Sequence, residues 1–425
     1  MINKRILSNG LKVVVSGMPH MESIAMGVFI GMGGRYEQKH VCGISHFIEH
    51  MLFKGTDSRD ARRLKQDIEG VGGQFNGFTS EEMTCFFVRV PARHISLGLD
   101  VLSDMVLNPR MDDAEIGKER HVICEEIKMY KDMPSSYVHE ILAEAMWPSH
   151  PLGRPLAGYE SVVERLDRKA LLGVKETAYV PSRTAVVAAG AVKKSDFLAA
   201  VNGRFRHFPR GKGMSFKPFS HSAPRGNVRI HHKETEQTHI AIGFHCPGRN
   251  AAEGDKYALN ILNIILGANM SSRLFEEVRE KRGLCYDISS TVKKFEETGA
   301  FFIHTGVSND KAAMALEAVM GELVRIKNES VEADELVRAK EFYKGQMLLA
   351  FEDTGSRMLW LGDKVMTRDG IPDMRSIPRH IENVRAEDVR KAANMVFARK
   401  NINLAAIGPK AALSEKAARR LMEIR

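Results

Sequence analysis

The chain has 425 residues, of which 44% are hydrophobic and 27% are charged, and its formal net charge is +9. These proportions are typical of a globular protein, and the length suits two domains better than one hydrophobic core. No apolar run approaches the roughly 20 residues that a membrane-spanning helix requires, so no membrane span is expected. The sequence shows no nucleic-acid-binding motif and no basic stripe interleaved with aromatic residues, which argues against a nucleic-acid partner.

The five cysteines indicate a reducing environment. Their number is odd, they are widely spaced and no C-x-x-C pair occurs, so neither a disulfide framework nor a thiolate zinc site is expected. The chain opens with a predicted strand around Ile6, an Asn9-Gly10 turn and a second strand over 11–15. Neither a signal peptide nor a transit peptide is visible there, and we therefore expect a cytoplasmic protein.

A weak internal repeat organises the rest of the chain. In each half, a strand that ends in glycine precedes an apolar helix, a second strand leads through a turn into another helix, and a long charged helix follows. The first copy occupies 23–37, 43–53, 86–109 and 112–130, and the second occupies 238–250, 257–267, 300–326 and 331–347. The two halves are therefore expected to fold alike.

The segment between the two copies, 206–226, is rich in Pro, Gly, Ser and basic residues and lacks apolar periodicity. Such a composition is typical of a linker, and a hinge there could let two domains close. The sequence thus predicts an α+β protein of two similar domains, each an antiparallel sheet with helices on one face. We place the N-terminal domain at 1–208, the linker at 209–225 and the C-terminal domain at 226–425.

The stretch SHFIEHMLFKGT, Ser45 to Thr56, carries a candidate metal site. Residues four apart share one face of a helix, so His46 and His50 can direct two imidazoles at one metal ion. Glu49 lies on the adjoining face, where its carboxylate could take a proton from a zinc-bound water. An H-x-x-E-H match arises by chance in about one chain in twenty of this kind, so the site also needs a third ligand.

The charged helix over 112–130 supplies candidates for that third ligand. Glu119 and Glu126 lie two turns apart on one face, so one could bind the metal while the other orients a histidine. Glu125 is an alternative ligand, although a shift of one residue rotates a side chain by about 100° around the helix. Solvated charges on a surface helix explain the same residues equally well, and the composition alone leaves the choice open.

Four motifs in this order, HFIEHMLFKGT, GGQFNGFTSEEMTCFF, ERHVICEEIKMYKDMP and HPLGRPLAG, resemble the pitrilysin/insulinase family of inverted-motif zinc peptidases. The similarity is greatest to the short members, which include the mitochondrial processing peptidase subunits and their bacterial relatives. In that family the third ligand is a glutamate about 76 residues past the second histidine, which is Glu126 here, and a supporting glutamate seven residues earlier is Glu119. The resemblance implies one Zn²⁺ per chain, bound by His46, His50 and Glu126.

The resemblance also implies a substrate-binding strand. By pattern, 78–90 is an alternating strand entered through Gly72-Gly73, and by itself it is better explained as a purely structural edge strand. An exposed edge can nevertheless pair with an extended peptide. In the family the substrate adds to this sheet, which places Asn76, Gly77 and Phe78 at the peptide, with Asn76 near the scissile bond. Gly77 departs from the alanine that the family often has there.

Arg279 and Tyr286 are the candidate substrate contacts in the second half. Taken alone, an Arg on a helix and a Tyr at the start of a strand are expected to be structural. In the family, an Arg and a Tyr at this spacing reach the substrate near the zinc, so Tyr286 could hydrogen-bond the oxyanion and Arg279 a backbone carbonyl. Because the chain carries both this pair and the metal motif, no different catalytic subunit is needed, and a monomer or homodimer is expected.

Three further histidines stand in the strand-like stretch RIHHKETEQTHIAIGF. His231 and His232 point to opposite faces of a strand and make a poor chelate. We interpret them, together with His239, as surface or packing residues.

The leading hypothesis is a zinc-dependent endopeptidase that cleaves extended, unstructured peptides through a zinc-bound water activated by Glu49. The resemblance implies that its two domains form a clamshell around a chamber. Acidic residues such as Asp132 and Glu140 favour basic or presequence-like peptides as substrates. The alternative is a non-catalytic scaffold, because some relatives keep the fold as structural subunits of membrane complexes. Those relatives usually lose zinc ligands, whereas the set here is intact.

Overall fold

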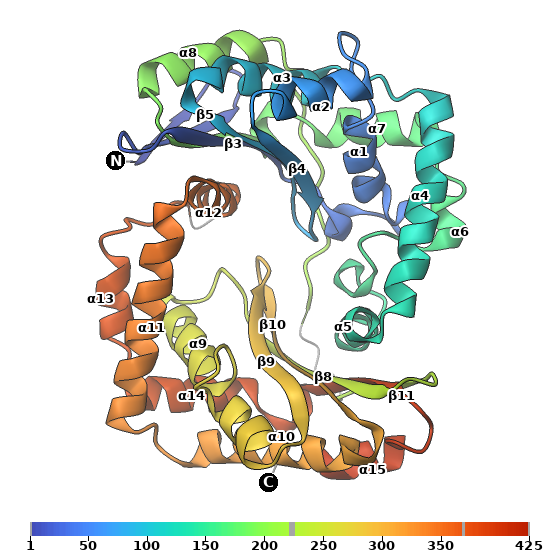
Figure 1. Ribbon diagram of the computed structural model, residues 1–425, viewed down its shortest axis with the longest axis vertical. Helices are drawn as coiled ribbons and strands as arrows, with labels where there is room; N and C mark the ends of the chain where they lie inside the picture. Colours follow the sequence, from blue (N-terminus) through green and yellow to red (C-terminus); the bar gives the residue numbers. More distant parts are fainter. Residues whose placement is uncertain (1, 221–225, 368–369, 424–425) are drawn as a thin grey trace. The chain divides into compact units, whose positions relative to one another are not determined.

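The computed structural model describes residues 2–220, 226–367 and 370–423, which form two compact units (Figure 1). Unit 1 comprises Met1–Lys128, Arg154–Lys217 and Leu348–Ile371, and unit 2 comprises Met129–Gly153, Pro218–Met347 and Pro372–Arg425. Each half of the sequence therefore contributes one segment to the unit that is formed mainly by the other half. A single domain boundary at the linker does not describe this arrangement. Of the predicted linker, 209–217 belongs to unit 1, whereas 221–225 lies outside the described residues, so the hinge stays a prediction.

Unit 1 is built on a six-stranded sheet with the order β1-β2-β6-β3-β5-β4. Its strands are β1 Ile2–Ile6, β2 Lys12–Gly17, β3 Ser23–Ile30, β4 Gln74–Thr79, β5 Thr84–Pro91 and β6 Thr184–Gly190. The predicted N-terminal hairpin is confirmed, with Gly10 at a φ of 97° in the turn between β1 and β2. The sheet is antiparallel except for β2 and β6, which run parallel.

The prediction of one continuous strand over 78–90 is wrong, because β4 and β5 are two strands of a hairpin. The chain turns between them, where the Ser80 N–H donates to the Met83 carbonyl at 2.8 Å. Polar residues that bond their own backbone favour turns, and Ser80 also donates its hydroxyl to Met83. The edge of the sheet is therefore β4, which carries Asn76, Gly77 and Phe78.

A layer of helices covers one face of this sheet, as predicted. It comprises α1 Ile44–Leu52, α2 Ala61–Glu69, α3 Ile95–Leu107 and α8 Lys194–Phe205. The helices α4 Asp113–Asp132, α6 Glu160–Val163 and α7 Arg168–Ala178 contribute residues to the same core. The helices α1, α3 and α4 fall where the apolar periodicity predicts them. Their apolar sides and one face of the sheet form a continuous core that includes Met26, Val28, Phe47 and Leu102. That core fixes α1 and α4, the two helices with the candidate ligands.

The opposite face of the same sheet is covered by α12 (Thr354–Met366), which packs on β3 and β6 and is seen beside β3 in Figure 1. Here Met358, Leu361 and Val365 pack on Phe29 and Val187. The structure thus adds a helix to the face that the sequence left uncovered. The burial of β6 agrees with this second helical layer. Every residue of β6 is buried, as expected for a strand covered on both faces.

Gly362→Ala is expected to destabilise unit 1 by about 1–3 kcal/mol, because α12 approaches the sheet most closely at this glycine. A Cβ at Gly362 would lie 2.0–2.4 Å from ring atoms of Phe29. The matched control is Gly345→Ala in α11 (Ala333–Glu352), where a Cβ meets nothing within 4 Å. The free energy of unfolding of both variants in urea checks the expectation. Equal changes in the two variants would show that the close contact between Gly362 and Phe29 does not contribute to stability.

Unit 2 repeats the design with a five-stranded sheet of order β7-β11-β8-β10-β9. Its strands are β7 Val228–His232, β8 Gln237–Pro247, β9 Cys285–Lys294, β10 Thr298–Ser308 and β11 Ile402–Gly408. Only β7 and β11 pair in parallel. On one face lies α5 (Pro134–Met146), whose Val138 and Leu142 pack on Ala241 and Ala405.

The other face of the unit 2 sheet packs on helices from the second half of the chain. Phe244 and Phe301 meet the ring of Phe397, which directly follows α14. The helices of this unit besides α5 and α11 are α9 Glu253–Leu266, α10 Ala312–Asn328, α13 Ile377–Glu382, α14 Ala386–Val396 and α15 Glu415–Leu421. The predicted helices within 257–267, 300–326 and 331–347 are confirmed. None of the helices in the described ranges is long and apolar enough to cross a bilayer.

Candidate metal centre

The position of α1 is set at its N-terminus by a buried carboxylate. Glu37 accepts the backbone N–H groups of Gly43 at 2.7 Å and Ser45 at 2.8 Å, which would otherwise be unpaired at the helix start. Burial raises the pKa of Glu37 to about 7, although these hydrogen bonds favour the ionised form. The first turn of α1, which carries His46, is thereby tied to the loop that follows β3.

Three side chains from α1 and α4 converge next to this turn. His46, His50 and Glu126 are half-buried, and each offers one potential ligand atom within 4.8 Å of the others. Glu126 Oε2 lies 3.7 Å from His46 Nε2 and 3.6 Å from His50 Nε2. Ligand atoms about 2 Å from a tetrahedral metal are separated by roughly 3.3 Å, so small side-chain movements suffice. Two imidazoles and one carboxylate are also a known donor set for catalytic zinc.

The electrostatics of the centre favour metal binding by His46. Burial, together with repulsion from His50, lowers the pKa of its imidazole to about 4. At neutral pH the ring is therefore uncharged, which is the form that binds a metal.

His50 is oriented from the side that faces away from Glu126. Its Nδ1 lies 3.0 Å from Glu119 Oε2, and Lys54 forms an ion pair with the same carboxylate. Burial alone would raise the pKa of Glu119, but the hydrogen bonds from His50 and Lys54 outweigh it and hold that pKa below its usual value. An ionised Glu119 accepts the Nδ1 proton and leaves the Nε2 lone pair for a metal.

Glu49 lies on the adjoining face of α1, and 9% of it is exposed. Thr79 at the end of β4 donates its hydroxyl to Glu49 Oε2 at 2.9 Å. Burial raises the pKa of Glu49, while the Thr79 hydrogen bond opposes that shift. A carboxyl group with a raised pKa is well suited to accept a proton and return it.

Sequence reasoning missed Lys54 and Thr79. Lys54 lies two residues past the end of α1, so no helical spacing marks its place beside Glu119. Thr79 directly follows Phe78, but its contact with Glu49 joins an edge strand to a helix, and no local pattern marks it.

The alternative ligand Glu125 points elsewhere. Its carboxylate pairs with Lys128 at 2.9 Å, and 73% of its side chain is exposed. The rotation between consecutive helical residues thus turns Glu126, and not Glu125, toward the histidines.

The candidate substrate strand, β4, lies at one of the two edges of the unit 1 sheet. Asn76 is exposed, and Gly77 and Phe78 are half-buried. A Cβ at Gly77 would lie 3.1 Å from the ring of Phe53 and 3.2 Å from the Cys85 carbonyl oxygen. An alanine at this position would therefore press on Phe53, whose ring would have to shift by a few tenths of an ångström.

Arg279 and Tyr286 come together within unit 2. The guanidinium of Arg279, in the π-helical turn Phe275–Lys281, lies 5.0 Å from the centre of the Tyr286 ring and 4.5 Å from that of Phe275. Tyr286 at the start of β9 is 79% exposed, so its hydroxyl is accessible. Contact of this pair with a substrate stays a prediction.

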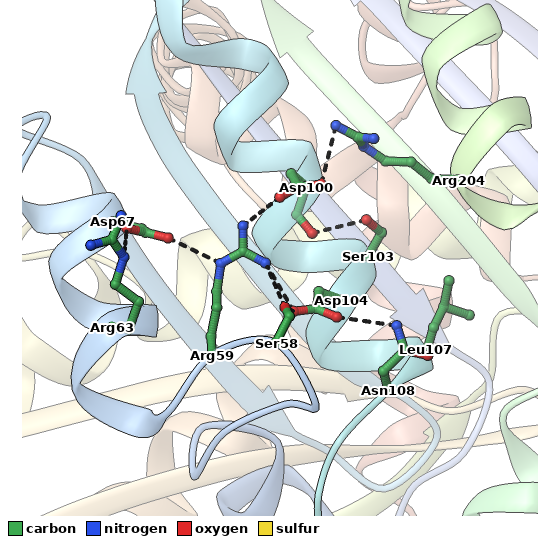
Figure 2. A pocket seen from close by; sticks show the side chains of 10 residues that line it. All are labelled: Ser58, Arg59, Arg63, Asp67, Asp100, Ser103, Asp104, Leu107, Asn108 and Arg204. Atoms are coloured by element: carbon green, nitrogen blue, oxygen red, sulfur yellow. Dashed lines mark hydrogen bonds and ion pairs between the residues drawn. The ribbon is translucent and has the colours of Figure 1, made fainter.

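A separate cavity of about 530 Å³ lies between the loop after α1 and the helices α2 and α3 (Figure 2). Figure 2 shows Arg59 surrounded by three carboxylates, with ion pairs of 3.0 Å to Asp67 and 2.9 Å to Asp104 and a further pair to Asp100. Arg63 also pairs with Asp67 and Arg204 with Asp100, so three cations balance the three acids and we interpret the cluster as structural. None of the residues that line this cavity belongs to the histidine centre.

Comparison with known proteins assigns the chain to a family. Residues 12–160 match the family described as insulinase (peptidase family M16), and residues 165–343 match the peptidase M16 inactive domain. The second match covers a stretch without the H-x-x-E-H motif, which fits one such metal site per chain.

Relatives and solved structures match this chain along almost its whole length. The chain is 34% identical to the uncharacterized zinc protease YmxG of Bacillus subtilis, covering 96% of this chain and 98% of the relative. It is 32% identical to an uncharacterized zinc protease of Streptomyces coelicolor, covering 99% and 92%. The crystal structure of a protease from Helicobacter pylori shares the fold, with a TM-score of 0.90 at 20% identity over 96% and 99% of the two chains. The chain therefore belongs to the insulinase family of peptidases, peptidase family M16.

Proposed function

We propose that the protein is a zinc-dependent endopeptidase that cleaves extended, unstructured peptides. The observation that carries this proposal is the convergence of His46, His50 and Glu126 beside the buried carboxylate of Glu49. Membership in the family and the zinc protease names of the relatives support it. A zinc ion in this centre would supply a Lewis acid that polarises the scissile carbonyl and acidifies a water molecule.

The residues around the centre then have distinct roles. His46, His50 and Glu126 hold the ion, and Glu119 fixes the ring of His50. Glu49 accepts a proton from the attacking water and passes it to the amine nitrogen of the leaving peptide. Thr79 holds one oxygen of Glu49 in place and thereby links the base to the edge strand.

The edge strand β4 suggests the physical state of the substrate. A peptide that adds to this edge has to be extended, so a segment within a folded domain cannot bind there. We assign substrate contacts to Asn76, Gly77 and Phe78. A preference for basic, presequence-like peptides has weaker support, because Asp132 already pairs with Lys233 at 2.9 Å and leaves Glu140 as the acid to consider. The enclosing chamber implied by the family stays a prediction.

We assign further substrate contacts to Arg279 and Tyr286 in unit 2, as the resemblance to the family implies. The exposed Tyr286 hydroxyl could donate to the oxygen that gains charge during attack, and Arg279 could bind a substrate carbonyl. With both sets in one chain, a monomer or homodimer should be active without a different catalytic subunit. The five free cysteines fit a reducing compartment such as the cytoplasm.

A peptide digest tests the proposal. The zinc-loaded protein is incubated with unstructured basic and acidic peptides, and products are identified by mass spectrometry before chelation, after chelation and after zinc is restored. We expect internal cleavage that chelation abolishes and zinc restores. Cleavage that resists chelation would refute the zinc mechanism. A protein that binds no zinc and cleaves nothing would instead support the scaffold alternative.

Lys54→Met is expected to weaken zinc binding about 10–100-fold, because Glu119 would lose the ion pair that favours its ionised form. The measurement is competition with a chromogenic chelator. Lys128→Met on α4 is the matched control, since Lys128 pairs with the exposed Glu125 instead. Equal zinc affinity in the two variants would show that Lys54 does not act through Glu119.

A further inference from the structure

We propose that unit 2 contains a second transition-metal site, formed by His139, His239 and His304. The three residues come from α5, β8 and β10, which are far apart in the sequence but adjacent in this unit. This centre shares no residue with the one formed by His46, His50 and Glu126, and it is independent of the proposed peptidase activity.

Two of the three imidazoles already have the separation of metal ligands. His239 Nδ1 lies 3.5 Å from His304 Nε2, and the two rings are nearly parallel. Two nitrogens that each bind a tetrahedral zinc ion at about 2.0–2.1 Å lie roughly 3.4 Å apart. A hydrogen bond between neutral rings would place the two nitrogens at a similar distance. A metal titration distinguishes metal binding from such packing.

The third imidazole is close and accessible. The ring centre of His139 lies 4.9 Å from that of His304, and the residue is exposed on α5. His239 and His304 are half-buried, so an ion can reach the pair from solvent. The His139 ring has to turn about its side-chain bonds to direct a nitrogen at the same point, and its exposure leaves it free to do so.

The strand register explains why the two rings share one face with space around them. In the pairing of β8 with β10, His239 faces Gly306 and His304 faces Ala241. Side chains alternate across a sheet, so residues 239, 241, 304 and 306 all project to the α5 side. A Cβ at Gly306 would lie 3.0 Å from Cε1 of His239, so the glycine makes room for this ring.

The charge state of the cluster favours soft divalent ions. Desolvation by the surrounding groups, which reaches even the exposed His139, lowers the pKa of all three imidazoles. Together with repulsion from His139 and His239 it brings the pKa of His304 to about 4, so the rings are neutral near pH 7. Lys293 on β9 adds a nearby positive charge that contributes to the shift of His139. An all-imidazole set suits Zn²⁺, Ni²⁺ or Cu²⁺, whereas Mg²⁺ and Ca²⁺ prefer oxygen ligands.

A metal bound here would join α5 to the sheet. Because the ligands come from a helix and two strands, only the folded unit brings them together. An ion that binds the native state and not the unfolded chain raises stability in proportion to its occupancy. The site would thus fasten the segment that the first half of the sequence contributes to unit 2.

Zinc stoichiometry tests the proposal without any activity assay. Metal-free protein is titrated with Zn²⁺ and examined by native mass spectrometry. We expect two ions per wild-type chain, one in His304→Asn, one in His239→Gln and one in His50→Asn. His232→Asn, which removes an exposed imidazole from the edge strand β7 of the same sheet, is the matched control and should keep two.

Thermal unfolding gives a second readout of zinc binding, because each variant is compared with itself in the presence and absence of Zn²⁺. Excess Zn²⁺ should raise the unfolding midpoint of His50→Asn and leave that of the His50→Asn/His304→Asn double variant unchanged. A wild type that loses every ion on the His50→Asn substitution, or a second ion that persists in both His304→Asn and His239→Gln, would overturn the proposal. Retention by His50→Asn of every ion that the wild type binds would count against the peptidase centre instead.

Discussion

Glu49→Gln is expected to lower kcat/KM for peptide cleavage by about 10²–10⁴-fold while zinc remains bound, because the amide cannot accept a proton from water. Glutamine keeps the shape of the side chain and can still accept the Thr79 hydroxyl, whose bond to Glu49 is 2.9 Å long. The measurement combines steady-state cleavage of a peptide from the digest with the zinc content of the same sample.

Thr79→Val provides a graded comparison for this variant. It removes the hydrogen bond that positions Glu49 but leaves the carboxylate, so cleavage should fall less than in Glu49→Gln. Unchanged activity of Glu49→Gln at full zinc occupancy would rule out Glu49 as the base. Loss of zinc from Glu49→Gln would show instead that this carboxylate is a ligand.

Glu126→Gln is expected to lose stoichiometric zinc and, with it, peptide cleavage. Its Oε2 lies 3.6–3.7 Å from the Nε2 atoms of both histidines, and a neutral amide oxygen is a far weaker donor than a carboxylate. The loss should exceed the roughly 10–100-fold effect of residues that only orient a ligand. Zinc affinity by chelator competition and activity at saturating zinc give the two readouts.

Glu125→Gln is the matched control, since it makes the same chemical change one residue earlier on α4. Glu125 is exposed and paired with Lys128, so this variant should bind zinc and cleave peptides as the wild type does. If Glu125→Gln lost zinc and Glu126→Gln kept it, the ligand assignment would be reversed. If both kept it, the two glutamates would be surface charges only.

Local periodicity made much of the centre predictable from the sequence. Residues four apart share a helix face wherever the helix lies, so His46 and His50 could be paired without knowledge of the fold. The seven-residue spacing of Glu119 and Glu126 carries the same kind of information. The strands and helices of both halves follow from apolar patterns of period two and 3.6, and the order of the motifs identifies the family.

Contacts between distant segments were decided only by the tertiary structure. The sequence left Glu125 and Glu126 open, because a helix can dock in more than one rotation about its axis, and the packing of α4 in the unit 1 core selects Glu126. The break between β4 and β5 also depends on hairpin pairing that a continuous alternating pattern conceals.

The exchange of α5 and α12 between the halves shows the same limit. Each helix is amphipathic, and its pattern says that one face is buried but not which sheet buries it. His139, His239 and His304 likewise appear unrelated in sequence and meet only because α5 crosses β8 and β10. Local patterns by themselves determined most of the elements that carry the site, the metal-binding motif and the family. Long-range packing decided which carboxylate faces the histidines, which side chains support them and where a second group of imidazoles gathers.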